Sequence, residues 1–145
     1  MAGPCKRVLA PEYGGDATMQ GRCTAMKPSL LGFPGHWAPN DLLFCGAEQF
    51  PERYRGGAFI SFHGSWNRDP LPQQGYDVVF VPFVDGEPSG DYEVFASAFA
   101  GDPPKDGGRH RPLGLAVAPD GSLFVSDDRS GWIYRIRFAG LTQTR

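Results

Sequence analysis

The chain has 145 residues, with fourteen Lys and Arg against sixteen Asp and Glu, so its formal charge is −2. This near-neutral balance gives no reason to expect nucleic-acid binding, which needs a basic surface, and no run of 18 apolar residues is present that could span a membrane. Twenty Gly and fourteen Pro make up nearly a quarter of the chain, about twice the usual share. Both residues destabilise helix interiors, and 41% apolar residues are too many for a disordered chain. The composition therefore predicts a turn-rich β fold.

The first half of the chain predicts an irregular segment followed by four strands. Residues 1–30 have little periodicity and lack the apolar centre of a secretory signal peptide. Further along, short apolar runs alternate with turn residues, as is typical of strands. The four predicted strands are 42–45, 57–62, 76–83 and 92–99. Pro82, which cannot donate to a strand ladder, is expected to mark an edge or a strand end.

The second half repeats this layout more compactly and predicts three further strands, with residues 139–145 as a C-terminal tail. A tight turn is expected at Asp120-Gly121, between the first two of the predicted strands 113–118, 123–126 and 132–138. Four strands followed by three favour an all-β fold, an antiparallel β-propeller segment of about two blades over residues 31–138. Because propellers have about four to eight blades, the chain is expected to belong to a longer protein, to self-associate, or to have another β architecture.

Three cysteines, at positions 5, 23 and 45, leave the redox state open. No CxxC pair is present, which argues against a structural zinc site. One disulfide with one free thiol and three reduced thiols are both compatible with this count.

Candidate binding residues lie in loops and at strand ends. His36, His63 and His110 have Gly, Trp or Arg neighbours there. Arg109 and Arg111 flank His110, and in an extended segment both side chains would point to one side. They are predicted to be exposed, either as a solvated or salt-bridged pair or as a clamp for a ligand with several carboxylates or phosphates.

The acidic pair Asp127-Asp128 follows a predicted strand. A turn cap, with side chains bonded to backbone N–H groups, is the favoured interpretation. A Ca²⁺ role is less favoured because the spacing of an EF-hand is missing.

Five separated motifs resemble a known family. They are His36-Trp-Ala-Pro-Asn-Asp, Phe50-Pro-Glu-Arg-Tyr-Arg-Gly-Gly-Ala-Phe, His63-Gly-Ser-Trp-Asn-Arg, Arg111-Pro-Leu-Gly-Leu-Ala-Val-Ala-Pro-Asp-Gly-Ser-Leu and Val125-Ser-Asp-Asp. In this order, over about residues 30–138, they resemble the C-terminal part of the glucose/sorbosone dehydrogenases. This resemblance implies a six-bladed β-propeller with pyrroloquinoline quinone (PQQ) over its central channel.

The resemblance also implies a set of cofactor-binding residues: His36, His63, Arg109 and Arg111, with Trp66 and Arg68 lining the same site. The family's general base and its Ca²⁺ ligands come from earlier blades. No catalytic residue and no metal ligand is therefore expected in this segment.

The implied function is that of the C-terminal portion of a PQQ-dependent sugar dehydrogenase, which oxidises a sugar at C1 by hydride transfer to the quinone. The expected partners are a sugar and an electron acceptor such as a cytochrome or a quinone, and the implied location is periplasmic or secreted. The alternatives are a catalytically incomplete propeller fragment and a carbohydrate-binding β module without enzyme activity. On its own, the chain is expected to be inactive or to hold the cofactor weakly.

Overall fold

The computed structural model describes residues 15, 27, 29–101 and 107–140. The chain divides into two compact units, Met1–Gly32 and Phe33–Arg145, and every element described below belongs to the second unit. The irregular segment expected over residues 1–30 lies almost entirely outside the described residues, as do residues 141–145 of the expected tail.

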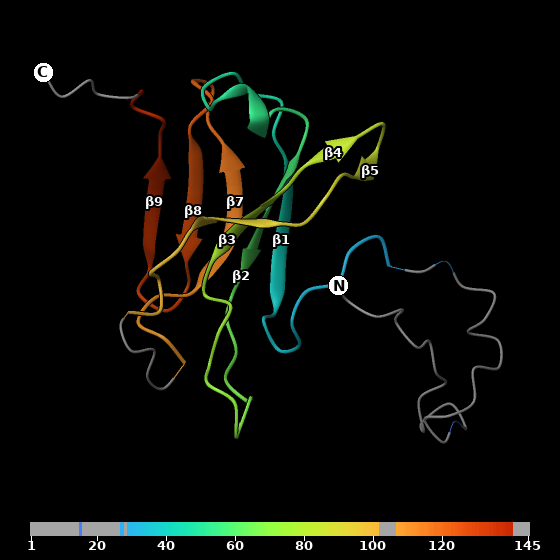
Figure 1. Ribbon diagram of the computed structural model, residues 1–145. Helices are drawn as coiled ribbons and strands as arrows, with labels where there is room; N and C mark the ends of the chain where they lie inside the picture. Colours follow the sequence, from blue (N-terminus) through green and yellow to red (C-terminus); the bar gives the residue numbers. More distant parts are fainter. Residues whose placement is uncertain (1–14, 16–26, 28, 102–106, 141–145) are drawn as a thin grey trace, which may run out of the picture. The chain divides into compact units, whose positions relative to one another are not determined.

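The first group of strands forms a four-stranded antiparallel sheet with the order β1-β2-β3-β6 (Figure 1). Its strands are β1 (Pro39–Phe44), β2 (Ala58–Phe62), β3 (Val78–Val81) and β6 (Glu93–Ala96). A short 3₁₀ helix, η3 (Glu52–Tyr54), lies between β1 and β2. A small hairpin of β4 (Phe83–Val84) and β5 (Glu87–Pro88) connects β3 to β6.

The second group forms a three-stranded antiparallel sheet with the order β7-β8-β9 (Figure 1). Its strands are β7 (Pro112–Val117), β8 (Leu123–Asp127) and β9 (Trp132–Ile136). The expected Asp120-Gly121 turn joins β7 to β8, and Gly121 has the positive φ of +81° that favours glycine there. These sheets confirm the all-β antiparallel prediction, and the described residues include no helix long and apolar enough to cross a membrane.

The predicted strand at residues 76–83 ends at Pro82, as expected for a proline that marks a strand end, but it begins later than predicted. β3 ends at Val81 and β4 begins at Phe83. Pro82 separates them because it has no N–H to continue the ladder. At the other end, Tyr76 is not part of the strand, and its side chain is buried in the core.

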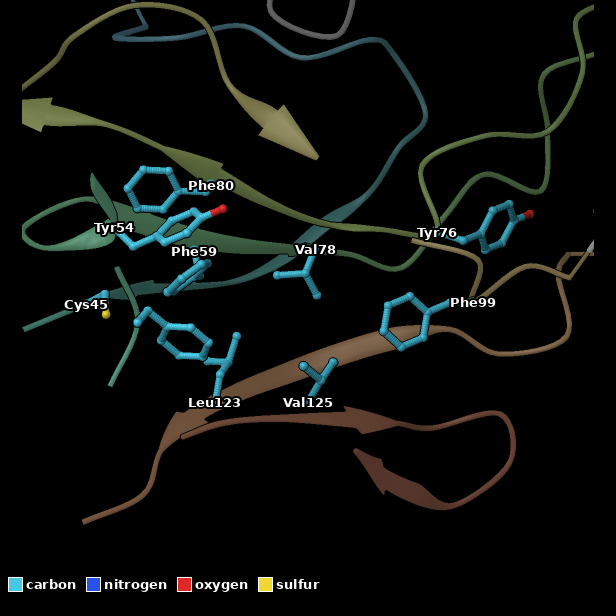
Figure 2. Packing of buried hydrophobic residues seen from close by; sticks show 10 residues of the cluster. Cys45, Tyr54, Phe59, Tyr76, Val78, Phe80, Phe99, Leu123 and Val125 are labelled. Atoms are coloured by element: carbon cyan, nitrogen blue, oxygen red, sulfur yellow. The ribbon is translucent and has the colours of Figure 1, made fainter. Parts of the chain in front are cut away.

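The core lies between the two sheets. Figure 2 shows Leu123 and Val125 of β8 pointing toward Phe59 and Val78 of the first sheet. Aromatic pairs extend this cluster, with ring centroids 4.8 Å apart for Tyr54 and Phe80. Such pairs contribute roughly 0.5–1.5 kcal/mol beyond the burial of their area. Every residue of β2 is buried, so this strand is covered on both faces.

Two side-chain hydrogen bonds also join the sheets. The buried hydroxyl of Ser61 in β2 donates to the carbonyl oxygen of Leu113 in β7. The backbone N–H of Leu115 donates to the Asp41 carboxylate at 2.7 Å. Both bonds fix how β7 lies against β1 and β2. Cys45, at the end of β1, is buried with a free thiol, whereas the other two cysteines lie outside the described residues.

Substitution of Gly57 tests how tightly the core is packed. A Cβ at this position would lie 2.2 Å from Cζ of Phe80 and 2.6 Å from the carbonyl oxygen of Val81. Gly57→Ala is therefore expected to lower the free energy of unfolding by about 1–3 kcal/mol, the usual cost of overpacking. Urea denaturation measures the change. Gly46→Ala is the matched control, because nothing lies within 4 Å of its new methyl group; equal stability of the two variants would contradict this packing.

Candidate functional site

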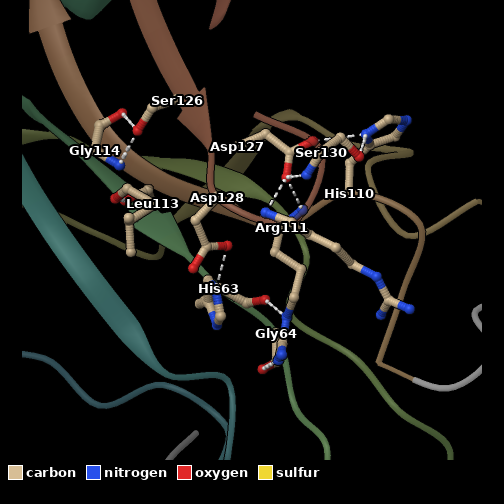
Figure 3. Close-up of polar contacts among 12 residues, drawn as sticks. His63, Gly64, His110, Arg111, Leu113, Gly114, Ser126, Asp127, Asp128 and Ser130 are labelled. Atoms are coloured by element: carbon tan, nitrogen blue, oxygen red, sulfur yellow. Dashed lines mark hydrogen bonds and ion pairs between the residues drawn. The ribbon is translucent and has the colours of Figure 1, made fainter. Parts of the chain in front are cut away.

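Polar side chains gather at one edge of the two sheets, where β2 and β8 end and β7 begins. His63 follows β2 directly, His110 and Arg111 precede β7, and Asp127 ends β8. Figure 3 shows these residues close together with Asp128 and Ser130. The antiparallel pairing of Pro112 with Asp127 brings the start of β7 and the end of β8 to the same edge.

Arg111 connects the two sheets through its side chain and its backbone. Its guanidinium donates from Nε to the carbonyl oxygen of His63 at 2.9 Å and from Nη2 to that of Gly64 at 2.6 Å. Its backbone N–H donates to Asp127 Oδ1 at 3.0 Å. The side chain also lies over the ring of Tyr76, 5.7 Å from the centroid. Arg111 is therefore half-buried, and the expectation that it is exposed is wrong, because the carbonyls after β2 need donors.

Asp127 is the buried centre of this cluster, with a side chain that is 0% exposed. Burial by itself would raise the pKa of this carboxyl. The hydrogen bonds from the backbone N–H of Arg111, from the His110 ring and from the backbone N–H groups of Ser130 and Arg129 outweigh burial and hold the pKa below its ordinary value. The predicted turn cap is confirmed, since Oδ1 accepts from the N–H groups of residues 129 and 130.

Each of two adjacent carboxylates holds one histidine. Nε2 of His63 lies 2.8 Å from Asp128 Oδ1, and Nδ1 of His110 lies 2.7 Å from Asp127 Oδ2. A carboxylate only accepts hydrogen bonds, so the contacting nitrogen carries the proton and the other nitrogen of a neutral ring becomes the acceptor. Both histidines can therefore present a proton-accepting nitrogen. Sequence reasoning did not predict these pairs, because they join residues 65 and 17 positions apart.

Arg109 lies in the same loop as His110 and Arg111, and it is exposed as expected. Its backbone alone is fixed: the N–H donates to the carbonyl oxygen of Ala100 at 2.8 Å, and the carbonyl accepts from Ser130 Oγ at 3.4 Å. The structure thus brings His63, Arg109 and Arg111 to one edge, with one exposed and one half-buried guanidinium.

His36 and Arg68 lie together in another place. Both line a cavity of about 390 Å³. His36 occupies the left-handed region at φ +67°, and Arg68 donates from Nη1 to the carbonyl oxygen of Pro72 at 2.8 Å. Trp66, in the loop after β2, is 76% exposed. Of the six predicted site residues, the structure therefore places three (His63, Arg109 and Arg111) in the cluster at the edge of the two sheets, which we call the strand-end cluster. Two lie at this cavity and one lies on the surface.

Within residues 29–101 and 107–140, no group of three or more His, Cys, Asp or Glu side chains is arranged to hold a metal ion. The Asp127-Asp128 pair instead uses its oxygens for the bonds described above.

The model of the TrAA12-like family matches residues 9–139. The chain belongs to the TrAA12-like family. In the solved calcium and iodide structures of Trichoderma reesei Carbohydrate-Active Enzymes Family AA12, the fold is similar, with TM-scores of 0.65 and 0.64 at 22% identity. The alignments cover 91% and 93% of this chain but only 32% and 33% of those chains.

Two relatives are more similar in sequence. A pyrroloquinoline quinone-dependent pyranose dehydrogenase of Coprinopsis cinerea is 35% identical over an alignment of 129 residues, and the match covers 78% of this chain and 16% of the relative. An uncharacterized protein of Borreliella burgdorferi is 33% identical over an alignment of 119 residues, and the match covers 79% of this chain and 30% of the relative. This TrAA12-like chain therefore spans less than a third of the length of the curated relatives it matches.

The TrAA12-like match corrects the resemblance to the glucose/sorbosone dehydrogenases, which is wrong as a family assignment. The motifs that carried the resemblance form strands and turns. The longest one, from Arg111 to Leu123, contains β7 and the turn before β8. Such motifs meet the backbone requirements of antiparallel strands and turns, so they identify the fold better than the family.

Asp127→Asn tests the buried carboxylate. At pH 7 the variant is expected to lose roughly 1–3 kcal/mol of unfolding free energy, because hydrogen bonds to a charged acceptor are the stronger ones. Since folding lowers the pKa of Asp127, its contribution is full above the unfolded-state pKa of about 3.9 and disappears as the pH falls through the folded-state value. The difference between wild type and variant should therefore shrink in acid. Urea denaturation at several pH values measures it, with the exposed turn variant Asp85→Asn as control. A difference independent of pH would contradict the assignment.

Removal of the Asp128 carboxylate tests the His63 pair. We expect His63 to carry its proton on Nε2 in the neutral wild type and to become a mixture of both tautomers in Asp128→Ala. The ¹⁵N chemical shifts of the ring report the change directly. His36, which is exposed, provides the reference, and an unchanged His63 tautomer would show that Asp128 does not hold it.

Proposed function

We propose that this chain is part of a PQQ-dependent sugar oxidoreductase and that it contributes a portion of the cofactor site. The similarity to a PQQ-dependent pyranose dehydrogenase supports the cofactor and the sugar class. The observation that carries the proposal is the cluster at one edge of the two sheets, where Arg111 bonds to the carbonyl oxygen of His63 and the backbone of Arg109 bonds to Ser130.

The proposed architecture is a β-propeller in which the two sheets are neighbouring blades, within residues 31–138. Each blade of a propeller is one sheet, and this chain has two such sheets while it covers about a third of the solved AA12 chains. At that proportion a complete ring would have six blades, which lies within the usual four to eight. The three-stranded sheet lacks the fourth strand of a full blade among the described residues. Further blades, from a longer chain or from associated copies, would complete the ring.

The donors of this cluster fit a planar ligand with several carboxylates. Arg111 uses two of its five N–H donors on backbone carbonyls, and its side chain forms no ion pair with a carboxylate of the described residues. Arg109 is exposed and adds a second guanidinium. Arginine forks bind carboxylates with two parallel hydrogen bonds, so Arg109 and Arg111 would hold the carboxylates of PQQ and His63 would contact the ring system.

His36 and Arg68, at their separate cavity, and the exposed Trp66 are proposed as further contacts to the cofactor. When bound, PQQ supplies the hydride acceptor for sugar oxidation. The general base and the Ca²⁺ ligands are proposed to come from other blades, and the reduced cofactor would pass its electrons to a cytochrome or quinone. A periplasmic or secreted location remains part of this proposal.

Titration of the purified chain with PQQ in the presence of Ca²⁺ tests the cofactor assignment. We expect the wild type to bind weakly and Arg109→Ala to bind about tenfold more weakly, because a charge-assisted hydrogen bond contributes roughly 1.5–3 kcal/mol. The quenching of tryptophan fluorescence measures both affinities. Arg137→Ala, an exposed arginine after β9, is the matched control and should bind as the wild type does.

Absence of PQQ binding by the wild type, or equal binding by Arg109→Ala, would contradict the proposed site. Reduction of a dye by glucose with PQQ present separates turnover from binding. Because the proposed base is supplied by other blades, we expect binding without turnover.

A further inference from the structure

Two Asp-Gly turns within the described residues have the same sequence but different surroundings. Asp85-Gly86 joins β4 to β5, and Asp120-Gly121 lies between β7 and β8. The two glycines have nearly equal φ values, +82° for Gly86 and +81° for Gly121. A difference in reactivity between these turns would therefore come from the contacts around them.

The Asp120-Gly121 turn is held by hydrogen bonds. The backbone N–H of Gly121 donates to the carbonyl oxygen of Ala118 at 2.8 Å. Asp120 Oδ1 accepts from the N–H of Ser122 at 3.1 Å and from its hydroxyl at 2.6 Å. Asp120 Oδ2 accepts from Nη2 of Arg135. Both the carboxylate and the glycine amide of this turn are thus engaged.

The same turn also packs closely on the loop that follows β1. Gly121 is buried, and a Cβ at this position would lie 2.7 Å from Cβ of Gln49 and 3.1 Å from Cβ of Ala47. These contacts leave the backbone of the turn little room to rotate.

The Asp85-Gly86 turn has none of these constraints. Both residues are exposed, and a Cβ at Gly86 would have nothing within 4 Å. Among the described residues, nothing forms a hydrogen bond or an ion pair with the Asp85 carboxyl or with the Gly86 N–H. Only two residue pairs form the ladder of this hairpin, and such exposed loop tips are the places where a chain is least restrained.

An aspartate followed by glycine can react with its own backbone. The glycine nitrogen attacks Cγ of the aspartate, the amide proton and the carboxyl hydroxyl leave as water, and a five-membered succinimide forms. Water then opens the ring. When the bond between the nitrogen and the former main-chain carbonyl breaks, the product is isoaspartate, in which the chain runs through Cβ and Cγ. Glycine favours this reaction because it has no Cβ to hinder the rotation that brings the nitrogen to Cγ.

The reaction needs a protonated carboxyl, a free glycine amide and freedom to rotate, and the surroundings of Asp120 oppose all three. Hydrogen bonds from Ser122 lower the pKa of Asp120 to about 2, so its protonated form is scarce. The Gly121 amide is occupied and the turn is packed. No contact of Asp85-Gly86 opposes any of these steps.

We propose that Asp85 is a site of spontaneous isoaspartate formation in the folded protein, whereas the fold protects Asp120 from the same reaction. The product adds one backbone carbon between Val84 and Glu87, so their ladder pair is expected to be lost. Phe83 keeps its contact with Phe44, whose ring centroid lies 5.0 Å away. The proposal involves neither PQQ nor a sugar, so it stands or fails independently of the proposed function.

The test is prolonged incubation of the purified chain at neutral pH and physiological temperature, followed by tryptic digestion. Asp85 and Asp120 fall in different tryptic peptides, and mass spectrometry with electron-transfer fragmentation distinguishes isoaspartate from aspartate in each. We expect about tenfold more isoaspartate at Asp85 than at Asp120, because hydrogen bonds must break first only at Asp120. In guanidinium chloride, where both turns are unfolded, the two sites should react at similar rates.

Asp120 also serves as an internal control for unfolding, because a globally unfolded molecule exposes both sites equally. Absence of isoaspartate at Asp85 in the folded chain, equal amounts at the two sites, or more at Asp120 would overturn the proposal. A preference for Asp85 that persists unchanged in guanidinium chloride would overturn it as well, because the difference would then come from the local sequence and not from the fold.

Discussion

The structure depends on the way Arg111 bonds to both sheets at once. Its guanidinium holds the carbonyls that follow β2, while its backbone N–H is held by Asp127 at the end of β8. Asp127 in turn fixes His110 and the turn before β9. One arginine and one buried carboxylate therefore connect the ends of β2 and β8 with the start of β7.

The strands could be predicted from the sequence, but the contacts made by Arg111 and Asp127 could not. All seven predicted strands are present, because apolar runs between turn residues report local backbone preference. The strand end at Pro82 was predicted as well, because proline has no N–H to donate to the ladder, and β3 and β4 lie on either side of it. The pairs of His63 with Asp128 and of Arg111 with the carbonyl of His63 join different sheets. No local pattern encodes such contacts, so the partners of His63 and Arg111 were not predicted, and the six residues grouped into one site by the resemblance were grouped without them.

The family of the chain depends on more positions than the five short motifs contain. Short motifs with Gly, Pro and Trp describe how a chain turns between strands, and different families with similar sheets need the same turns. A match over residues 9–139 also samples the solvent-facing and loop positions between the motifs, where families differ. The pyranose dehydrogenase relative is named as PQQ-dependent, and a ligand with several carboxylates requires cationic groups such as arginine in any β fold.

The burial of β2 along its whole length has a consequence for motion. Its backbone pairs with β1 on one side and β3 on the other, so its amides exchange with solvent through openings whose free energy approaches that of global unfolding. The β4–β5 hairpin and the exposed residues of β9 can open locally at much lower free energy. His63 follows directly on the most protected strand, and its backbone is therefore among the last parts of the molecule to fluctuate.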